Sequence, residues 1–178
     1  MIQQINAVQA TFYRSALALL LALMMISAHA DEIDLRLLAG IGNVNTDYSL
    51  PGQDEKGRHE AIQVLHYIYE GPWPHAWGLE IGRHRVFTSS VGDLDYTVIG
   101  IFVEARPYKH LMTQIGTLGY HGSGISDNNP FGLRAGIGTD YPLNDRFKLV
   151  GFVRQERIFD KEETTIISLE LGIQFRIW

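Results

Sequence analysis

The chain has 178 residues, of which 15 are basic, 20 are acidic and none is cysteine. Its net charge of −5 argues against nucleic-acid binding, and the lack of cysteine excludes disulfides and thiolate metal sites. Although 46% of the residues are hydrophobic, no stretch after residue 30 reaches the roughly 18 to 20 uninterrupted apolar residues of a membrane-spanning helix, which excludes a helical membrane protein.

Residues 1–30 have the pattern of a secretory signal peptide. A start that contains one base, Arg14, and no acid is followed by an apolar run at 16–26 and by a small-residue A-x-A cleavage pattern that ends at Ala30. The apolar run is too short to span a bilayer. We therefore expect the signal peptide to be removed and residues 31–178, with 14 basic and 20 acidic residues, to form one domain.

Eight segments of the remaining chain alternate between apolar and other residues, as β-strands do. The last segment shows it most clearly, because Leu169, Leu171 and Ile173 fall on one face while Glu170 and Gln174 fall on the other. The pattern does not assign the faces of the second, fifth and seventh segments. The expected strands are 33–45, 59–70, 75–87, 95–106, 111–121, 131–141, 146–158 and 164–178.

The connections between these strands are of two kinds. Those after the second, fourth and sixth strands are tight and contain proline, at 71–74, 107–110 and 142–144. Those after the odd-numbered strands are longer or more charged, at 47–58, 89–94, 122–130 and 159–163. Bacterial outer-membrane barrels have short periplasmic turns and longer external loops, and an even strand number places both chain ends on the periplasmic side.

These features predict an all-β fold, an eight-stranded antiparallel up-and-down transmembrane β-barrel in the outer membrane of a Gram-negative bacterium. We expect a monomer without an open pore, which contacts outer-membrane lipid and lipopolysaccharide and uses the barrel-assembly machinery during insertion. In this arrangement the apolar face of the last strand, including Leu169, Leu171, Ile173 and Phe175, turns toward lipid.

A soluble lipocalin-like barrel would show the same alternation with its apolar side inward. The non-apolar faces argue against it, because they are crowded with glycine and charge, and glycine leaves room for charged side chains to pair inside a narrow barrel. Buried charges of mixed sign need partners, so we expect an ionic network that plugs the lumen. Its expected members are Glu80, Glu104, Arg106, Arg134, Asp140, Glu170 and Arg176.

The signal peptide, the eight strands and the C-terminal strand together resemble the small outer-membrane β-barrel proteins of the OmpX, OmpA-transmembrane and PagL group. Gly172, Phe175 and Ile177 fit the assembly signal of that group, whereas Trp178 lies one residue beyond the expected terminal aromatic. The resemblance implies the architecture but not an activity, because barrels of this shape include adhesins, stability factors and lipid A enzymes. Our first interpretation is a non-enzymatic protein whose external loops contact lipopolysaccharide or surface partners.

The alternative interpretation is a lipid A acyl-ester hydrolase. His121 and Ser123 share one face of an extended chain, where the imidazole could take the hydroxyl proton. This resembles the His-x-Ser-Asn pattern of the PagL lipid A 3-O-deacylases (acyloxyacyl hydrolases), but here Gly124 replaces the Asn and the pattern follows the fifth strand instead of the penultimate one. The acids considered for the dyad are Asp127, Asp140 and Glu156, and, on the last strand, Glu170.

No cofactor and no metal site are expected. The histidines after the signal peptide lack the close paired spacing that is typical of metal ligands. They are His59, His66, His75, His84, His110 and His121.

Overall fold

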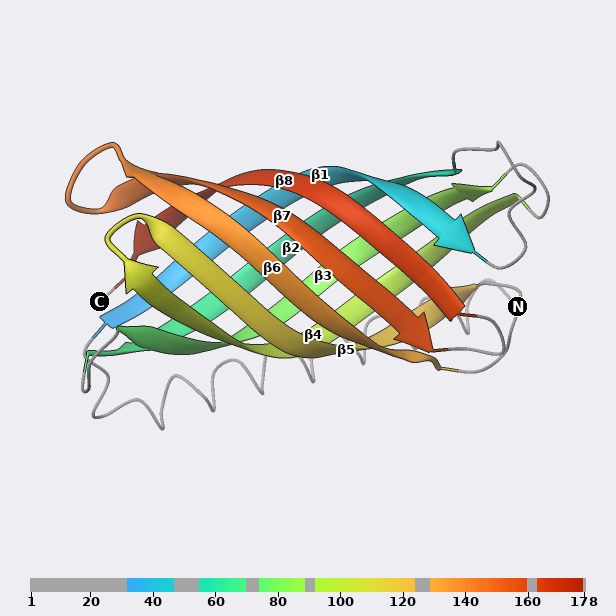
Figure 1. Ribbon diagram of the computed structural model, residues 1–178, viewed down its shortest axis with the longest axis horizontal. Coiled ribbons are helices and arrows are strands. Elements are labelled where there is room, and N and C mark those ends of the chain that lie inside the picture. The colour runs from blue at the N-terminus through green and yellow to red at the C-terminus, as the bar shows by residue number, and fades with distance from the viewer. Residues whose placement is uncertain are drawn as a thin grey trace, which may run out of the picture. The chain divides into compact units, whose positions relative to one another are not determined.

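The computed structural model describes residues 32–46, 55–69, 74–88, 92–123, 129–159 and 163–177, so the expected signal peptide lies outside the described residues. Within these ranges the chain forms eight strands that cross the molecule at a slant (Figure 1). They are β1 (Glu32–Thr46), β2 (Glu55–Ile68), β3 (His75–Thr88), β4 (Gly92–Tyr108), β5 (Leu111–Ser123), β6 (Phe131–Pro142), β7 (Phe147–Phe159) and β8 (Glu163–Arg176).

Each strand pairs in antiparallel fashion with the next one along the chain, and β8 pairs with β1 to close the barrel. The closing register places Asp34 opposite Arg176 at one end and Thr46 opposite Thr164 at the other. Closure leaves no strand edge unpaired, which removes the usual site of edge-to-edge aggregation. The predicted eight-stranded antiparallel up-and-down barrel is confirmed. Within the described ranges, no helix is long and apolar enough to cross a membrane.

Two predicted boundaries on the loop side are wrong, since β2 begins at Glu55 and β4 begins at Gly92. The predicted loops 47–58 and 89–94 are correspondingly shorter. Both misplaced segments are polar, and Lys56 and Arg58 are exposed where an outward residue would be apolar further down the strand. An alternation of apolar and polar residues therefore fails to mark the strand there.

The two faces of the barrel have opposite polarity. Ile101, Ile115 and Leu171 point outward and are 60%, 67% and 66% exposed, whereas Arg36 and Glu104 point inward and are 0% exposed. An apolar outer surface around a charged interior is the arrangement of a transmembrane barrel and the reverse of a soluble one. The predicted faces of β8 are confirmed, since Leu169, Leu171 and Ile173 are exposed while Glu170 and Gln174 are buried.

The structure also orients the three strands that the pattern left open. The inward residues include Gln63 and Tyr67 on β2, Gln114 on β5, and Arg154 and Glu156 on β7, and all of them are buried. At the loop end the interior changes from charged to apolar. A cluster there, the loop-end cluster, consists of Val44, Val86, Val98, Leu118, Tyr120, Ile158 and Ile166.

Gly172 allows the close approach of β1 and β8 at the closing seam. It lies opposite Leu38, and a Cβ atom at this position would overlap the carbonyl oxygen of Leu37. Backbone cannot rotate away as a side chain can, so a larger residue here must shift the seam. Gly119 on β5 offers a contrast, because a Cβ there would meet only the Ile99 carbonyl at 3.8 Å.

We expect Gly172→Ala to lower the free energy of unfolding by about 1–3 kcal/mol, the usual cost of overpacking. The matched control, Gly119→Ala, adds the same methyl group where there is space and should change stability by less than about 0.5 kcal/mol. Urea unfolding in micelles, followed by tryptophan fluorescence, measures both. Equal effects of the two substitutions would contradict a special role for the seam.

Candidate functional site

Arg36 on β1 is the hub of a polar network in the middle of the lumen. Its guanidinium donates to Glu104 of β4 at 2.8 Å and to Gln63 of β2 at 3.0 Å. It also donates to Gln174 of β8 at 2.7 Å, and it lies over the Phe152 ring at 4.9 Å. One side chain on β1 thus connects to β2, β4 and β8.

A second group of charges lies closer to the loop end. Arg134 of β6 bridges two carboxylates, with Glu80 and Glu156 each at 2.5 Å. Arg154 of β7 pairs with Glu170 of β8 at 2.5 Å. All five side chains are at most 2% exposed, so these ion pairs are shielded from water and each charge depends on its partners.

The predicted ionic network is confirmed for the seven predicted residues, but it has further members. At the turn end, Arg106 pairs with Asp140 at 2.6 Å, and Arg176 pairs with Glu32 at 2.7 Å. Together with the two groups above, all seven predicted residues have an oppositely charged partner. Most carboxylates in the described part of the lumen pair with cations, so the network ties the strands together across the interior.

Sequence reasoning missed Arg36, Arg154, His59 and His84 as members of the network. For Arg36 the sequence carries a signal, because Arg36 lies on the same strand face as Asp34, two residues before it. Leu38, two residues after Arg36, lies on that face too. For Arg154 and His59 the strands carried no clear alternation, so only the observed register shows that they point inward. His59 Nδ1 lies 2.8 Å from Glu170 Oε1 and belongs to the same network.

The predicted catalytic pair is placed away from its acid candidates. His121 is exposed on the outer surface, and its Nδ1 lies 2.7 Å from the Asn129 side-chain oxygen. Tyr120 next to it points inward and donates to Glu156, so Glu156 lies on the other face of the sheet. Ser123 ends β5, but its side chain lies outside the described residues.

The other acid candidates are no closer to His121. Asp140 lies near the turn end of β6, where it pairs with Arg106 and His110, while His121 lies at the loop end of β5. Glu170 is buried in the lumen and bonded to Arg154. Asp127 lies outside the described residues. The described acid candidates, Glu156, Asp140 and Glu170, are thus bonded elsewhere, while His121 lies on the outer surface.

A cluster of basic side chains lies on the outer surface at the loop end, and we call it the basic patch: Lys56, Arg58, Arg83 and Arg85. Arg58 and Arg85 are direct partners in the β2–β3 register. The side chains of Arg83 and Arg85 are 51% and 44% exposed. Asp95 of β4 pairs with Arg83 and lies 3.5 Å from Arg85, so a single carboxylate serves two guanidiniums.

Arg36→Met should lower the free energy of unfolding by about 3–5 kcal/mol, because it leaves the buried Glu104 carboxylate without its main cation. The double substitution Arg36→Met/Glu104→Met removes both charges and should recover a large part of that loss. Urea unfolding of the two variants and of Glu104→Met completes the double-mutant cycle. Additive losses would show that the pair is not coupled.

For the esterase interpretation, we expect no loss of acyl chains from lipid A, because His121 lies on the outer surface while the described acid candidates are bonded to cations of the lumen network. Mass spectrometry of lipid A from cells that express the wild-type protein or Ser123→Ala should give the same set of acyl chains. Loss of one acyl chain with the wild type but not with Ser123→Ala would overturn this expectation and establish the hydrolase.

A scan against protein-family models and a search of curated proteins give no match. Among solved structures, the chain is similar to Neisserial surface protein A (NspA), with a TM-score of 0.51 and 14% identity over 82% of this chain and 97% of that chain. It is similar to Ail of Yersinia pestis, with a TM-score of 0.49 and 14% identity over 82% and 98%. It is also similar to OprG of Pseudomonas aeruginosa, with a TM-score of 0.46 and 9% identity over 84% of this chain and 97% of that chain. At these identities the similarity to NspA shows the fold alone, and the expected architecture of a small eight-stranded outer-membrane β-barrel is confirmed.

Proposed function

We propose that the protein is a non-enzymatic outer-membrane barrel that binds the phosphate groups of lipopolysaccharide through the basic patch. The signal peptide would deliver it to the periplasm, and the barrel-assembly machinery would insert it. The observation that carries the proposal is the direct opposition of Arg58 and Arg85 on the outer surface, next to the apolar band.

The position of the patch matches the headgroup level of a membrane. Arg58 lies four residues beyond the exposed Ile62 along β2, and Arg85 lies four residues beyond Ile81 along β3, both toward the loop end. The tight turns lie at the opposite end of the barrel, together with the start of β1 and the last residues of β8 (Figure 1). Because strands are threaded from the periplasm, the loop end faces outward and the patch lies in the outer leaflet.

The charge of the patch calls for an anion. Like charges directly opposite on neighbouring strands destabilise a sheet unless a counter-charge lies between them. The described side chains nearby include two acids against four bases. The acids are Asp95 and Glu60, and Glu60 lies opposite Arg83. The described side chains of this surface therefore carry two more positive than negative charges.

Phosphate groups suit the basic patch better than the carboxylates of an acidic peptide would. Guanidinium groups donate two parallel hydrogen bonds to phosphate oxygens, and the bonds are strengthened by charge. The phosphates of lipid A are held at the boundary between acyl chains and water, which is where the patch lies relative to the apolar band. Ile62 and Ile81 below would then contact the acyl chains of the same lipid.

A binding experiment with purified protein in detergent tests the proposal. The double substitution Arg58→Gln/Arg85→Gln should weaken the binding of bisphosphorylated lipid A by at least about tenfold, the effect of one lost charge-assisted bond. Native mass spectrometry across a lipid titration measures the change.

The matched control removes two exposed basic residues from the turn end, Lys109→Gln/Arg146→Gln, and should leave lipid A affinity unchanged. Dephosphorylated lipid A provides the second comparison and should bind the wild type as weakly as it binds the patch variant. If the wild type bound both lipids equally, or if the turn-end variant lost as much affinity, the patch would not be a phosphate site.

A further inference from the structure

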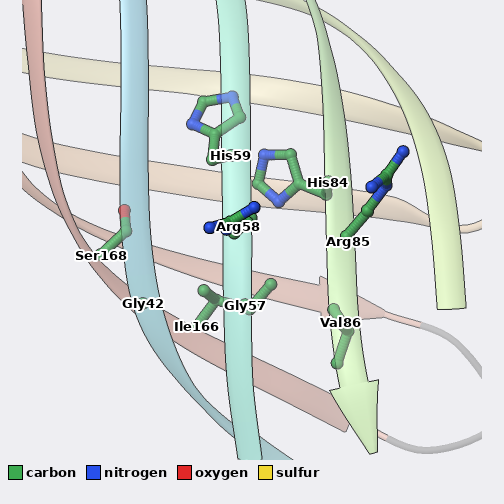
Figure 2. Close-up of a pocket in the computed structure, with 9 residues that line it drawn as sticks. All are labelled: Gly42, Gly57, Arg58, His59, His84, Arg85, Val86, Ile166 and Ser168. Atoms are coloured by element: carbon green, nitrogen blue, oxygen red, sulfur yellow. The ribbon is translucent and has the colours of Figure 1, made fainter. Parts of the chain in front are cut away.

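A small pocket lies inside the lumen beneath the loop-end cluster, and two histidines line it (Figure 2). His59 of β2 and His84 of β3 are direct partners in the strand register, and their ring centroids are 4.0 Å apart. Ser168, Val86 and Ile166 line the same pocket. Two imidazoles thus meet next to an unfilled space.

A carboxylate from the far side of the barrel completes a group of three. Glu156 of β7 points toward His84, with 3.6 Å between Glu156 Oε2 and His84 Nδ1. One donor atom from each of His59, His84 and Glu156 lies within 4.8 Å of the others, and all three side chains are buried. They come from three strands whose separation in the sequence conceals the cluster.

The imidazoles are not satisfied by the protein. The Nε2 atoms of both His59 and His84 are buried and have no hydrogen-bond partner, and each residue is only 3% exposed. An unmade hydrogen bond at a buried polar atom is costly, so such atoms mark a place where a further partner is expected. This observation is independent of the distances within the group.

The surroundings hold these side chains as metal ligands are usually held. His59 places its Nδ1 2.8 Å from Glu170 Oε1, which fixes the ring and directs Nε2 away from that carboxylate. Tyr120 donates to Glu156 Oε2 at 3.0 Å. Metal-binding histidines characteristically use their second ring nitrogen on a carboxylate, and metal-binding carboxylates are themselves hydrogen-bonded.

The charge balance of this region also leaves room for a cation. Three buried carboxylates, Glu80, Glu156 and Glu170, face two buried guanidiniums, Arg134 and Arg154. One negative charge therefore has no guanidinium to match it, and burial makes such a charge expensive. A protonated His59 next to Glu170 and Glu80 can supply that positive charge, and a metal cation held by the two imidazoles would take the place of the proton.

We propose that His59, His84 and Glu156 bind a divalent transition metal of the Zn²⁺ class inside the lumen. Imidazole nitrogen combined with carboxylate oxygen favours zinc and its neighbours over magnesium or calcium, which prefer oxygen alone. Glu80 Oε1, which is buried, unpartnered and 3.5 Å from His59 Nε2, is the candidate fourth ligand. The metal would join β2, β3 and β7 across the lumen, independently of any lipid bound outside.

The donor atoms of His59, His84 and Glu156 lie further apart than the ligand atoms of a bound metal ion would. Tetrahedral zinc with nitrogen ligands at about 2.0–2.1 Å requires donor atoms roughly 3.3 Å apart. The donor atoms lie within 4.8 Å of one another, so on binding they must approach by up to about 1.5 Å. The neighbouring pocket permits such a movement of the rings. The absence of a side chain at Gly82 helps, because a Cβ there would lie 3.2 Å from His59 Nε2.

The test is to refold the purified protein with excess Zn²⁺, remove free metal by gel filtration and measure bound zinc by mass spectrometry. We expect about one zinc per chain for the wild type and at least a tenfold loss in His59→Gln and in His84→Gln. The control, His110→Gln, changes an exposed turn histidine and should keep full occupancy. Circular dichroism verifies that each variant has formed the barrel.

Co²⁺ provides a readout that needs no variant. A site of two imidazoles and a carboxylate should give the visible absorption of four-coordinate cobalt when the folded wild type is titrated, and Zn²⁺ should abolish it. Wild-type protein that retains no zinc and shows no cobalt absorption overturns the proposal. Equal zinc retention by the wild type and by His59→Gln/His84→Gln overturns it as well, since the metal would then lie elsewhere.

Discussion

The need to pair every charge inside a narrow lumen is the constraint on which the rest of this structure depends. Arg36, Arg134 and Arg154 are almost fully buried, and each would be prohibitively costly without its carboxylates. Two of the pairs cross the lumen, Arg36 with Glu104 and Arg134 with Glu80, so they tie non-adjacent strands together as well as balancing charge. The glycines on the inner face provide the space that these long side chains occupy. These side chains fill the described middle of the lumen.

The same strand register serves both surfaces of the barrel. Arg58 and Arg85 oppose each other on the outside, and the adjacent pair His59 and His84 oppose each other on the inside. Because side chains alternate along a strand, a slip of one residue would move the basic pair into the lumen and the histidines to the outside. The basic patch and the lumen histidines therefore depend on the same strand register, although they lie on different faces of the sheet.

Much of the fold could be predicted from sequence, and the reasons for the failures are physical. β8 is predictable because one of its faces meets lipid and the other meets buried charge, so its alternation is complete. β2 was not oriented because its outer face carries His66 and its inner face carries Leu65 and Tyr67, which blurs the contrast in polarity. The start of β2 was misplaced because its outward residues leave the apolar band there and become basic.

The sites were less predictable than the fold, since they depend on contacts between distant segments. The proximity of His59 and His84 follows from the pairing of β2 with β3, and their approach to Glu156 follows from closure of the whole barrel. Neither spacing is visible along the chain. His121 and Ser123 show the opposite case, a local pattern that suggested chemistry, whereas the described His121 ring faces away from the lumen carboxylates.

The position of Arg36 near the start of the barrel has a consequence for how the protein assembles. Its partners Gln63, Glu104 and Gln174 lie 27, 68 and 138 residues away along the chain. Contacts of such long range are formed slowly, because much chain entropy is lost before any of them is made. Until β8 reaches β1 the guanidinium lacks Gln174, and an unclosed sheet would present this charge to the acyl chains. The set of hydrogen bonds around Arg36 is therefore complete only when β8 has closed on β1.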